Sequence, residues 1–97
     1  MVEHIVLWKF TPEATKEQKE EMMRQLLTLK DKLPGITAAT VGWNFSERNQ
    51  GYTVGFRVTF TDRAALENYL PSDAHQSLVA KYIAPISAEV CVVDYEY

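Results

Sequence analysis

The chain has 97 residues, of which 46% are hydrophobic and 24% charged, and its formal net charge at pH 7 is -3. This length allows a single domain over residues 1–97 with a thin core, and the apolar share is typical of a folded protein. Acidic and basic residues are mixed and no stretch approaches the roughly 18 apolar residues of a membrane span, so we expect a cytoplasmic protein with no nucleic acid or membrane partner.

Residues 2–10 are predicted to form the first strand, and their apolar side chains fall on both faces, which indicates that both faces are covered. Thr11-Pro12 ends this strand, and Thr15 with Gln18 three residues later forms a capping box that begins a helix. Pro34-Gly35 ends that helix by the usual C-terminal chemistry. Its buried stripe is expected to consist of Met22, Met23, Leu26, Leu27, Leu29 and Leu33.

Two strands and a short helix follow. Residues 36–45 form a weaker strand, residues 46–51 a polar hairpin connection, and residues 52–60 the most regular alternation of the chain. Asp62 then caps a short helix, whose apolar residues are Leu66, Tyr69 and Leu70.

The second helical region is predicted to be broken at Pro71, because proline has no backbone N–H, and Ser72 caps the helix that follows. If that helix begins at Asp73, His75 shares one face with apolar residues that turn toward the core, namely Leu78, Val79 and Tyr82. A histidine at the edge of a core needs a hydrogen-bond partner for each nitrogen. Either the protein supplies both partners, or the ring faces a cavity in which a ligand supplies one.

Residues 88–97 form the last strand, so the order of elements is β-α-β-β-α-β. Short connections and right-handed crossovers favour a four-stranded antiparallel sheet with both helical regions on one face, an α+β fold of the ferredoxin-like kind. The single cysteine, Cys91, is interpreted as a small hydrophobic residue of this last strand.

The sheet face that the helices leave open is predicted to be too apolar for water and too polar for a dry core. It carries Ile5, Leu7, Thr53, Gly55, Arg57, Thr59, Cys91, Val93 and Tyr95. Two copies that pack these faces across a two-fold axis resolve the mismatch, so we expect a homodimer through the open sheet face. The alternative is a monomer with a moderately adhesive sheet.

Five segments resemble the stress-responsive A/B barrel domain family, and together they span nearly the whole chain. They are His4-Ile5-Val6-Leu7-Trp8-Lys9-Phe10, Gly51-Tyr52-Thr53, Val58-Thr59-Phe60, the stretch from Tyr69 to His75, and Val93-Asp94-Tyr95. The resemblance implies a dimeric α+β barrel. For function the family offers two precedents. One member cyclises a linear polyketide by an aldol condensation, and other members have no settled activity.

The resemblance assigns catalytic roles to Tyr69 and His75, and places His4 and Asp94 near the pocket. Histidine is suited to act as a base at neutral pH, and a phenol can donate a hydrogen bond to a carbonyl or enolate oxygen. The expected substrate-binding residues are His4, Val6, Trp8, Met23, Leu26, Phe56, Leu70 and Asp94. The chain departs from the cyclase at two pocket positions, where Val54 and Ser72 replace histidines, so the substrate is not transferred.

We therefore predict a protein that binds a small carbonyl or aromatic compound and has the groups to convert it by acid/base chemistry, without a cofactor. One alternative is a non-catalytic stress-related or structural homodimer, whose histidines are satisfied internally. Another is a monooxygenase of the same superfamily, either cofactor-independent or dependent on haem. No metal is expected, because no local spacing of ligands suits one. A cavity of about 300 Å³ or more that reaches both rings favours the binding prediction.

Overall fold

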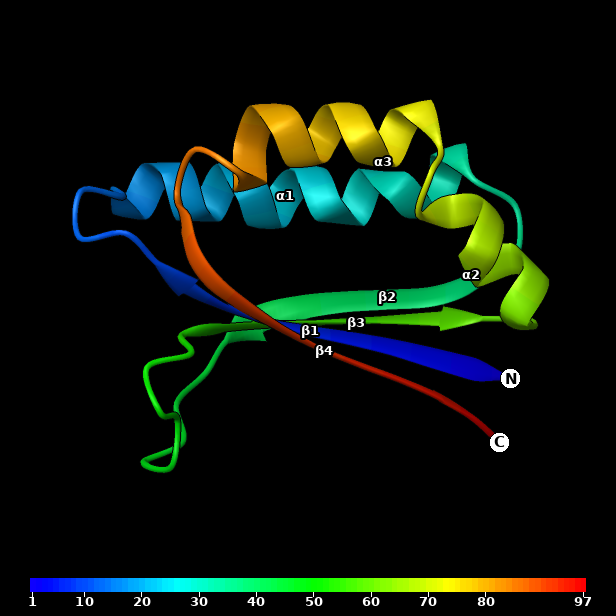
Figure 1. Cartoon of the computed structure of the whole chain (residues 1–97), viewed down its shortest axis with the longest axis horizontal. Helices are drawn as coiled ribbons and strands as arrows, with labels where there is room; N and C mark the ends of the chain where they lie inside the picture. The colour runs from blue at the N-terminus through cyan, green and yellow to red at the C-terminus, as the bar shows by residue number, and fades with distance from the viewer.

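Four antiparallel strands form one sheet in the order β2-β3-β1-β4 in the computed structural model, which describes residues 1–97 (Figure 1). The strands are β1 (Val2–Phe10), β2 (Ile36–Trp43), β3 (Val54–Phe60) and β4 (Ser87–Glu96). The two ends of the chain lie together, since the N-terminal amine of Met1 donates to the carbonyl of Tyr97 at 3.0 Å. β2 and β4 are the edge strands, so one long edge of β4 has no neighbouring strand in the chain.

The helices lie on one face of the sheet, as Figure 1 shows. They are α1 (Lys16–Lys32), α2 (Arg63–Tyr69), α3 (Asp73–Leu78) and η1 (Val79–Ile83), of which the last is a single π-helical stretch that continues α3. One antiparallel sheet with helices on one face confirms the predicted ferredoxin-like α+β fold.

The polar residues predicted to begin each helix do so. Thr15 accepts from the N–H of Gln18 while the Gln18 side chain accepts from the N–H of Thr15, which completes the capping box. Asp62 caps α2, and Ser72 caps α3 by accepting from the N–H of His75. Pro71 separates α2 from α3, so the chain changes direction between Tyr69 and His75.

The core lies between the sheet and the helices. The strands present alternate residues to the helices, and α1 contributes Met22, Leu26 and Leu29. The predicted stripe was wrong at Leu27, whose exposed fraction is 42%, while Met23 and Leu33 are half-buried. Successive residues of a helix differ by about 100° around its axis, and Leu27 therefore turns off the line formed by the three buried residues.

Two leucines of α1 make a matched test of this packing. Leu29→Ala should lower the free energy of unfolding by about 2–5 kcal/mol, because it empties a site where the leucine is 1% exposed. Leu27→Ala should change it by about 0.5 kcal/mol, as for other surface substitutions. Urea denaturation of the two variants measures both values, and equal losses would contradict the assignment of the buried face.

The β2–β3 hairpin is shorter than predicted, because β2 ends at Trp43 and β3 begins at Val54. The side chain of Asn44 accepts from the N–H of Ser46 at 2.9 Å, and this local turn replaces the regular ladder. The connection then projects away from the helices (Figure 1) and leaves Phe45 99% exposed. Thr53, predicted for the open sheet face, lies in this connection instead.

The open sheet face contains a buried carboxylate that the sequence did not predict. Both oxygens of Glu3 accept hydrogen bonds at 2.6 Å, one from the hydroxyl of Thr59 and the other from that of Tyr97. The bond from Thr59 is the main reason that the pKa of Glu3 is lowered, with the Tyr97 bond and the nearby Arg57 acting in the same direction. Other residues of this face stay open, notably Val93 and Tyr95.

Candidate functional site

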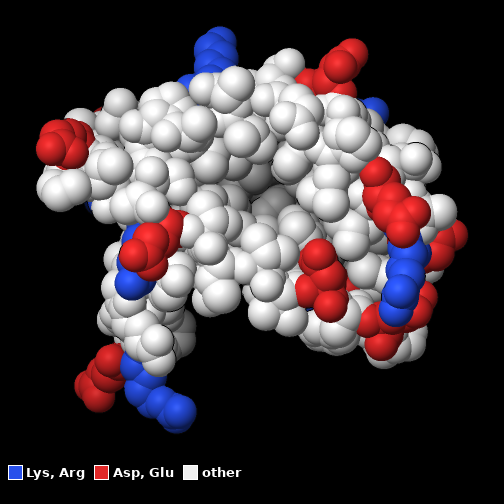
Figure 2. Space-filling model, viewed as in Figure 1, with Lys and Arg blue, Asp and Glu red and all other residues white.

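An apolar hollow of about 210 Å³ opens on the helix side of the sheet, between β1, β4 and the segment from α2 to η1. Figure 2 shows a hollow near the middle of the face viewed there, with uncharged residues around it and charged side chains toward the rim. No Lys, Arg, Asp or Glu lines it; the twelve lining residues are His4, Val6, Trp8, Leu26, Phe56, Tyr69, Leu70, His75, Val79, Ile83, Val90 and Val92.

Tyr69 lies between the two histidines of the chain. Its ring centroid is 4.6 Å from that of His75 and 6.0 Å from that of His4. Three separate elements supply these rings: β1 carries His4, α2 ends at Tyr69, and α3 carries His75 beyond the break at Pro71. The break therefore positions a phenol and an imidazole six residues apart in the sequence against each other.

His75 uses one ring nitrogen for structure and keeps the other free. Its Nδ1 lies 2.9 Å from the carbonyl oxygen of Leu70, which can only accept, so Nδ1 carries the proton and Nε2 the lone pair. Burial is the main cause that lowers the pKa of His75, opposed by the bond to Leu70 and reinforced by the neighbouring His4. The neutral ring is consequently the dominant form at neutral pH.

His4 is held in the same manner by a different partner. Its Nδ1 lies 2.5 Å from Oδ1 of Asp94, its cross-strand neighbour on β4. A carboxylate accepts, so the proton of this bond lies on Nδ1 and Nε2 is left without a partner in the chain. No unpaired polar side-chain atom of the protein is sealed from solvent, and the buried His4 ring therefore reaches solvent-accessible space through Nε2.

The hydroxyl of Tyr69 also has no hydrogen-bond partner in the chain, although the residue is only 2% exposed. Because no such atom is sealed, the hydroxyl reaches solvent-accessible space, and Tyr69 lines both the apolar hollow and a second hollow beside Gly35 and Asn68. Burial raises the pKa of this phenol well above its usual value, so it stays protonated and can donate. A buried phenol without a partner is a costly arrangement unless a ligand or water completes it.

Most of the residues predicted for the site come together around this hollow. Eight of them line it: His4, Val6, Trp8, Leu26, Phe56, Tyr69, Leu70 and His75. Met23 does not line it and is half-buried against the core. Asp94 does not line it either, but holds His4 from a neighbouring hollow.

Sequence reasoning missed four lining residues, namely Val79, Ile83, Val90 and Val92. The first two lie at the ends of η1, whose π-helical bond from the N–H of Ala84 to the carbonyl of Val79 has no sequence signature. The volume is also below the roughly 300 Å³ that would favour the binding prediction. Val90 and Val92 of the edge strand β4 are half exposed and leave the hollow open on that side.

These features define a small α+β domain whose helix-covered sheet carries an apolar hollow with three polar groups at one end. The chain belongs to the stress responsive A/B barrel domain family, whose sequence model matches residues 2–97, and this confirms the resemblance seen in the sequence.

Olivetolic acid cyclase from Cannabis sativa is 30% identical over 76 residues, which are 76% of this chain and 75% of the cyclase. The solved structure of At3g17210 from Arabidopsis thaliana is 28% identical, with a TM-score of 0.89 over 100% of this chain and 95% of its own. A dimeric ferredoxin-like protein of unknown function from Jannaschia sp. CCS1 is 32% identical, with a TM-score of 0.83 over 99% of this chain and 98% of its own.

No helix combines the length and the apolar composition needed to cross a bilayer. No three His, Cys, Asp or Glu side chains are grouped so that they could hold a metal ion.

Proposed function

We propose that the protein binds a small uncharged carbonyl compound in the apolar hollow and removes a proton from the carbon next to the carbonyl. The proton passes to Nε2 of His75, the electrons of the C–H bond form a carbon–carbon double bond, and the carbonyl π electrons move to oxygen. The hydroxyl of Tyr69 donates a hydrogen bond to that oxygen, where the negative charge develops. The product is an enolate or enol that is ready to attack a second carbonyl.

One observation carries this proposal: a phenol donor and two imidazole nitrogens lack partners in the chain beside a single apolar hollow. A histidine satisfied internally needs bonds at both nitrogens, and here each ring has one. Because no charged side chain lines the hollow, an uncharged substrate avoids an uncompensated buried charge. The relation to olivetolic acid cyclase supports carbonyl chemistry.

Deuterium exchange tests the proton abstraction without knowledge of the natural substrate. We expect the protein in D₂O to accelerate the loss of the α-proton signals of 4-phenylbutan-2-one, followed by NMR. His75→Ala should lower the catalysed rate by about 10²–10⁴-fold, the usual contribution of a general base. Because the pKa of His75 is lowered from its ordinary value of 6.5, the imidazole stays unprotonated at pH values just below 6.5. The exchange rate should therefore fall only at more acidic pH.

Leu27→Ala serves as the control, because that side chain lies on the exposed face of α1, away from the hollow. It should exchange the ketone at the wild-type rate. Wild-type protein that gives no more than the buffer rate, or a His75→Ala variant as active as the wild type, would contradict the assignment of His75 as base.

We also propose that the protein is a homodimer joined through the open sheet face. Val93, Tyr95 and Tyr97 leave apolar and aromatic surface on this face, beside the buried Glu3. A stable interface buries about 800 Å² on each partner, and a sheet face supplies such an area in one piece. The related Jannaschia protein is described as dimeric, which supports this assembly.

A further inference from the structure

The connection between β2 and β3, residues 44–53, forms an arm that holds an aromatic side chain in solvent. Phe45 is 99% exposed, the most exposed of the large hydrophobic side chains in the chain. The arm is ordered by its own hydrogen bonds: Nδ2 of Asn44 donates to the carbonyl of Tyr52 at 2.8 Å, and Oδ1 of Asn44 accepts from the N–H of Ser46 at 2.9 Å. The single chain therefore presents a phenyl ring in a fixed place, and covering that ring with a partner removes apolar surface from water.

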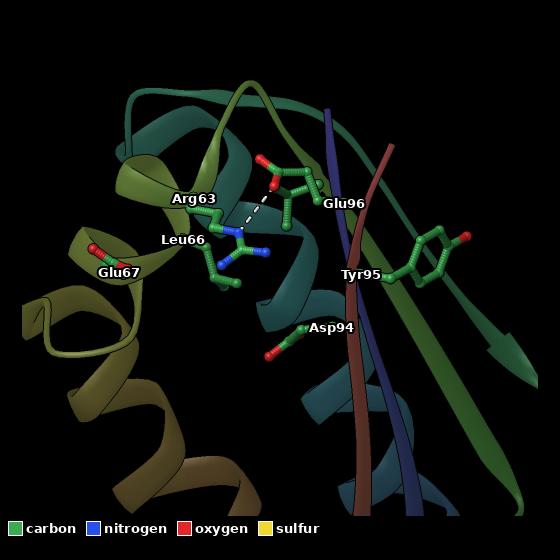
Figure 3. Close-up of a pocket in the computed structure, with 7 residues that line it drawn as sticks. Arg63, Leu66, Glu67, Asp94, Tyr95 and Glu96 are labelled. Atoms are coloured by element: carbon green, nitrogen blue, oxygen red, sulfur yellow. Dashed lines mark hydrogen bonds and ion pairs between the residues drawn. The ribbon is translucent and has the colours of Figure 1, made fainter.

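The arm stands on the side of the sheet that the helices leave open. Figure 1 shows it projecting away from the helices, beyond the ends of β2 and β3. The open face extends across the sheet to β4, where Figure 3 shows Tyr95 pointing away from Arg63 and Leu66 of α2. A second copy that packs on this face therefore has the arm beside it.

The open face also carries a shallow recess of about 440 Å³ over β2 and β3, where Gly42 and Gly55 pair directly. A Cβ on Gly42 would meet no atom within 4 Å, and one on Gly55 would meet only Leu7, at an ordinary 3.5 Å. Neither glycine has a positive φ, so the fold of the single chain does not require glycine at either position. Glycine inside a strand weakens it and often marks a place where a ligand or another backbone approaches closely.

We infer that Phe45 of each copy packs into the recess over Gly42 and Gly55 of the other copy and so clasps the dimer at two places. This inference rests on the proposed homodimer through the open sheet face. A two-fold interface is self-complementary, so the surface that carries a projection must also carry the matching recess, and the open side of this sheet carries both. The rim of the recess suits a phenyl ring, because Ile5 is apolar and the guanidinium of Arg57 can pack on an aromatic face.

The dissociation constant of the dimer, measured by sedimentation velocity over a dilution series, tests this clasp. Phe45→Ala should raise the constant about 30-fold or more, as expected for an aromatic anchor buried in an interface. Gly42→Val should raise it by a similar factor, because the new side chain fills the recess. Both variants should fold, since Phe45 is exposed and a side chain at Gly42 meets open space in the single chain, and circular dichroism verifies this.

A double variant tests whether the recess receives the ring. If Phe45 occupies the recess, Phe45→Ala made in the Gly42→Val background should raise the dissociation constant by less than about threefold, because the contact is already lost. Leu27→Ala is the matched control, since it removes an exposed apolar side chain from the helix side of the protein. It should keep the dissociation constant of the wild type.

The outcomes separate this inference from the proposed homodimer. A dimeric wild type whose dissociation constant is unchanged by Phe45→Ala would overturn the clasp and leave the sheet-face dimer standing. Losses that add in the double variant would show that the ring contacts another part of the second copy, and the recess would be the wrong receiving site. A wild type that stays monomeric at every concentration would overturn both proposals.

Discussion

Tyr69→Phe is expected to lower the rate of α-deuteration by about 10²–10³-fold, the usual effect of removing one donor to a developing oxyanion. The same substitution should leave the free energy of unfolding within about 0.5 kcal/mol of the wild type. The reason is structural: the phenol hydroxyl has no partner in the chain, so its loss breaks no internal hydrogen bond. NMR exchange rates and urea denaturation measure the two quantities on the same samples.

Tyr97→Phe is the matched control for this prediction, because it removes a hydroxyl from the opposite face of the sheet. The hydroxyl of Tyr97 donates to Glu3, so its loss should lower the free energy of unfolding and leave the exchange rate unchanged. A structural role for Tyr69 predicts the reverse pattern, with a loss of stability and no loss of exchange. That result would remove the phenol from the mechanism.

The parts of the site that could be predicted depend on local sequence. The break at Pro71 and the cap at Ser72 fix where α3 begins, and this fixes the face on which His75 lies. Alternation along β1 then places His4 on the helix side of the sheet. Local rules therefore placed two of the three rings, and the resemblance to the family added the third, Tyr69.

The hydrogen-bond partners of these rings could not be predicted, because they depend on register and distance. Asp94 reaches His4 through the pairing of β4 with β1, 90 residues apart in the sequence. The sequence was compatible with a single histidine that bonds both a backbone carbonyl and Asp94. In the structure these partners are divided: His75 bonds the carbonyl of Leu70, and His4 bonds Asp94. That division leaves one nitrogen free on each ring.

Glu3 shows the same limitation on the other face of the sheet. A glutamate in a strand is ordinarily expected at a solvated position. Its burial results from hydroxyls of Thr59 and Tyr97, which lie 56 and 94 residues away. No local pattern signals such a cluster, since its members meet only when β1 pairs with β3 and β4.

Val93→Asp is expected to convert the proposed homodimer into a monomer. Val93 lies on the open sheet face of β4 and is 50% exposed in the single chain, so a charge there costs the monomer little. In the proposed dimer the same position is buried, and a carboxylate without a partner costs several kcal/mol at each copy. Light scattering coupled to gel filtration should give the mass of two chains for the wild type and of one for the variant.

Val90→Asp is the control, because Val90 lies on the same strand with a similar exposure of 49% but faces the apolar hollow. It should keep the mass of the dimer and instead weaken binding of 4-phenylbutan-2-one, since it places a charge beside the apolar body of the ligand. The two variants add the same charge to opposite faces of one strand, so the protein's net charge changes equally in both. Dissociation by Val90→Asp and not by Val93→Asp would move the interface to the helix side of β4, where the second copy would close the hollow.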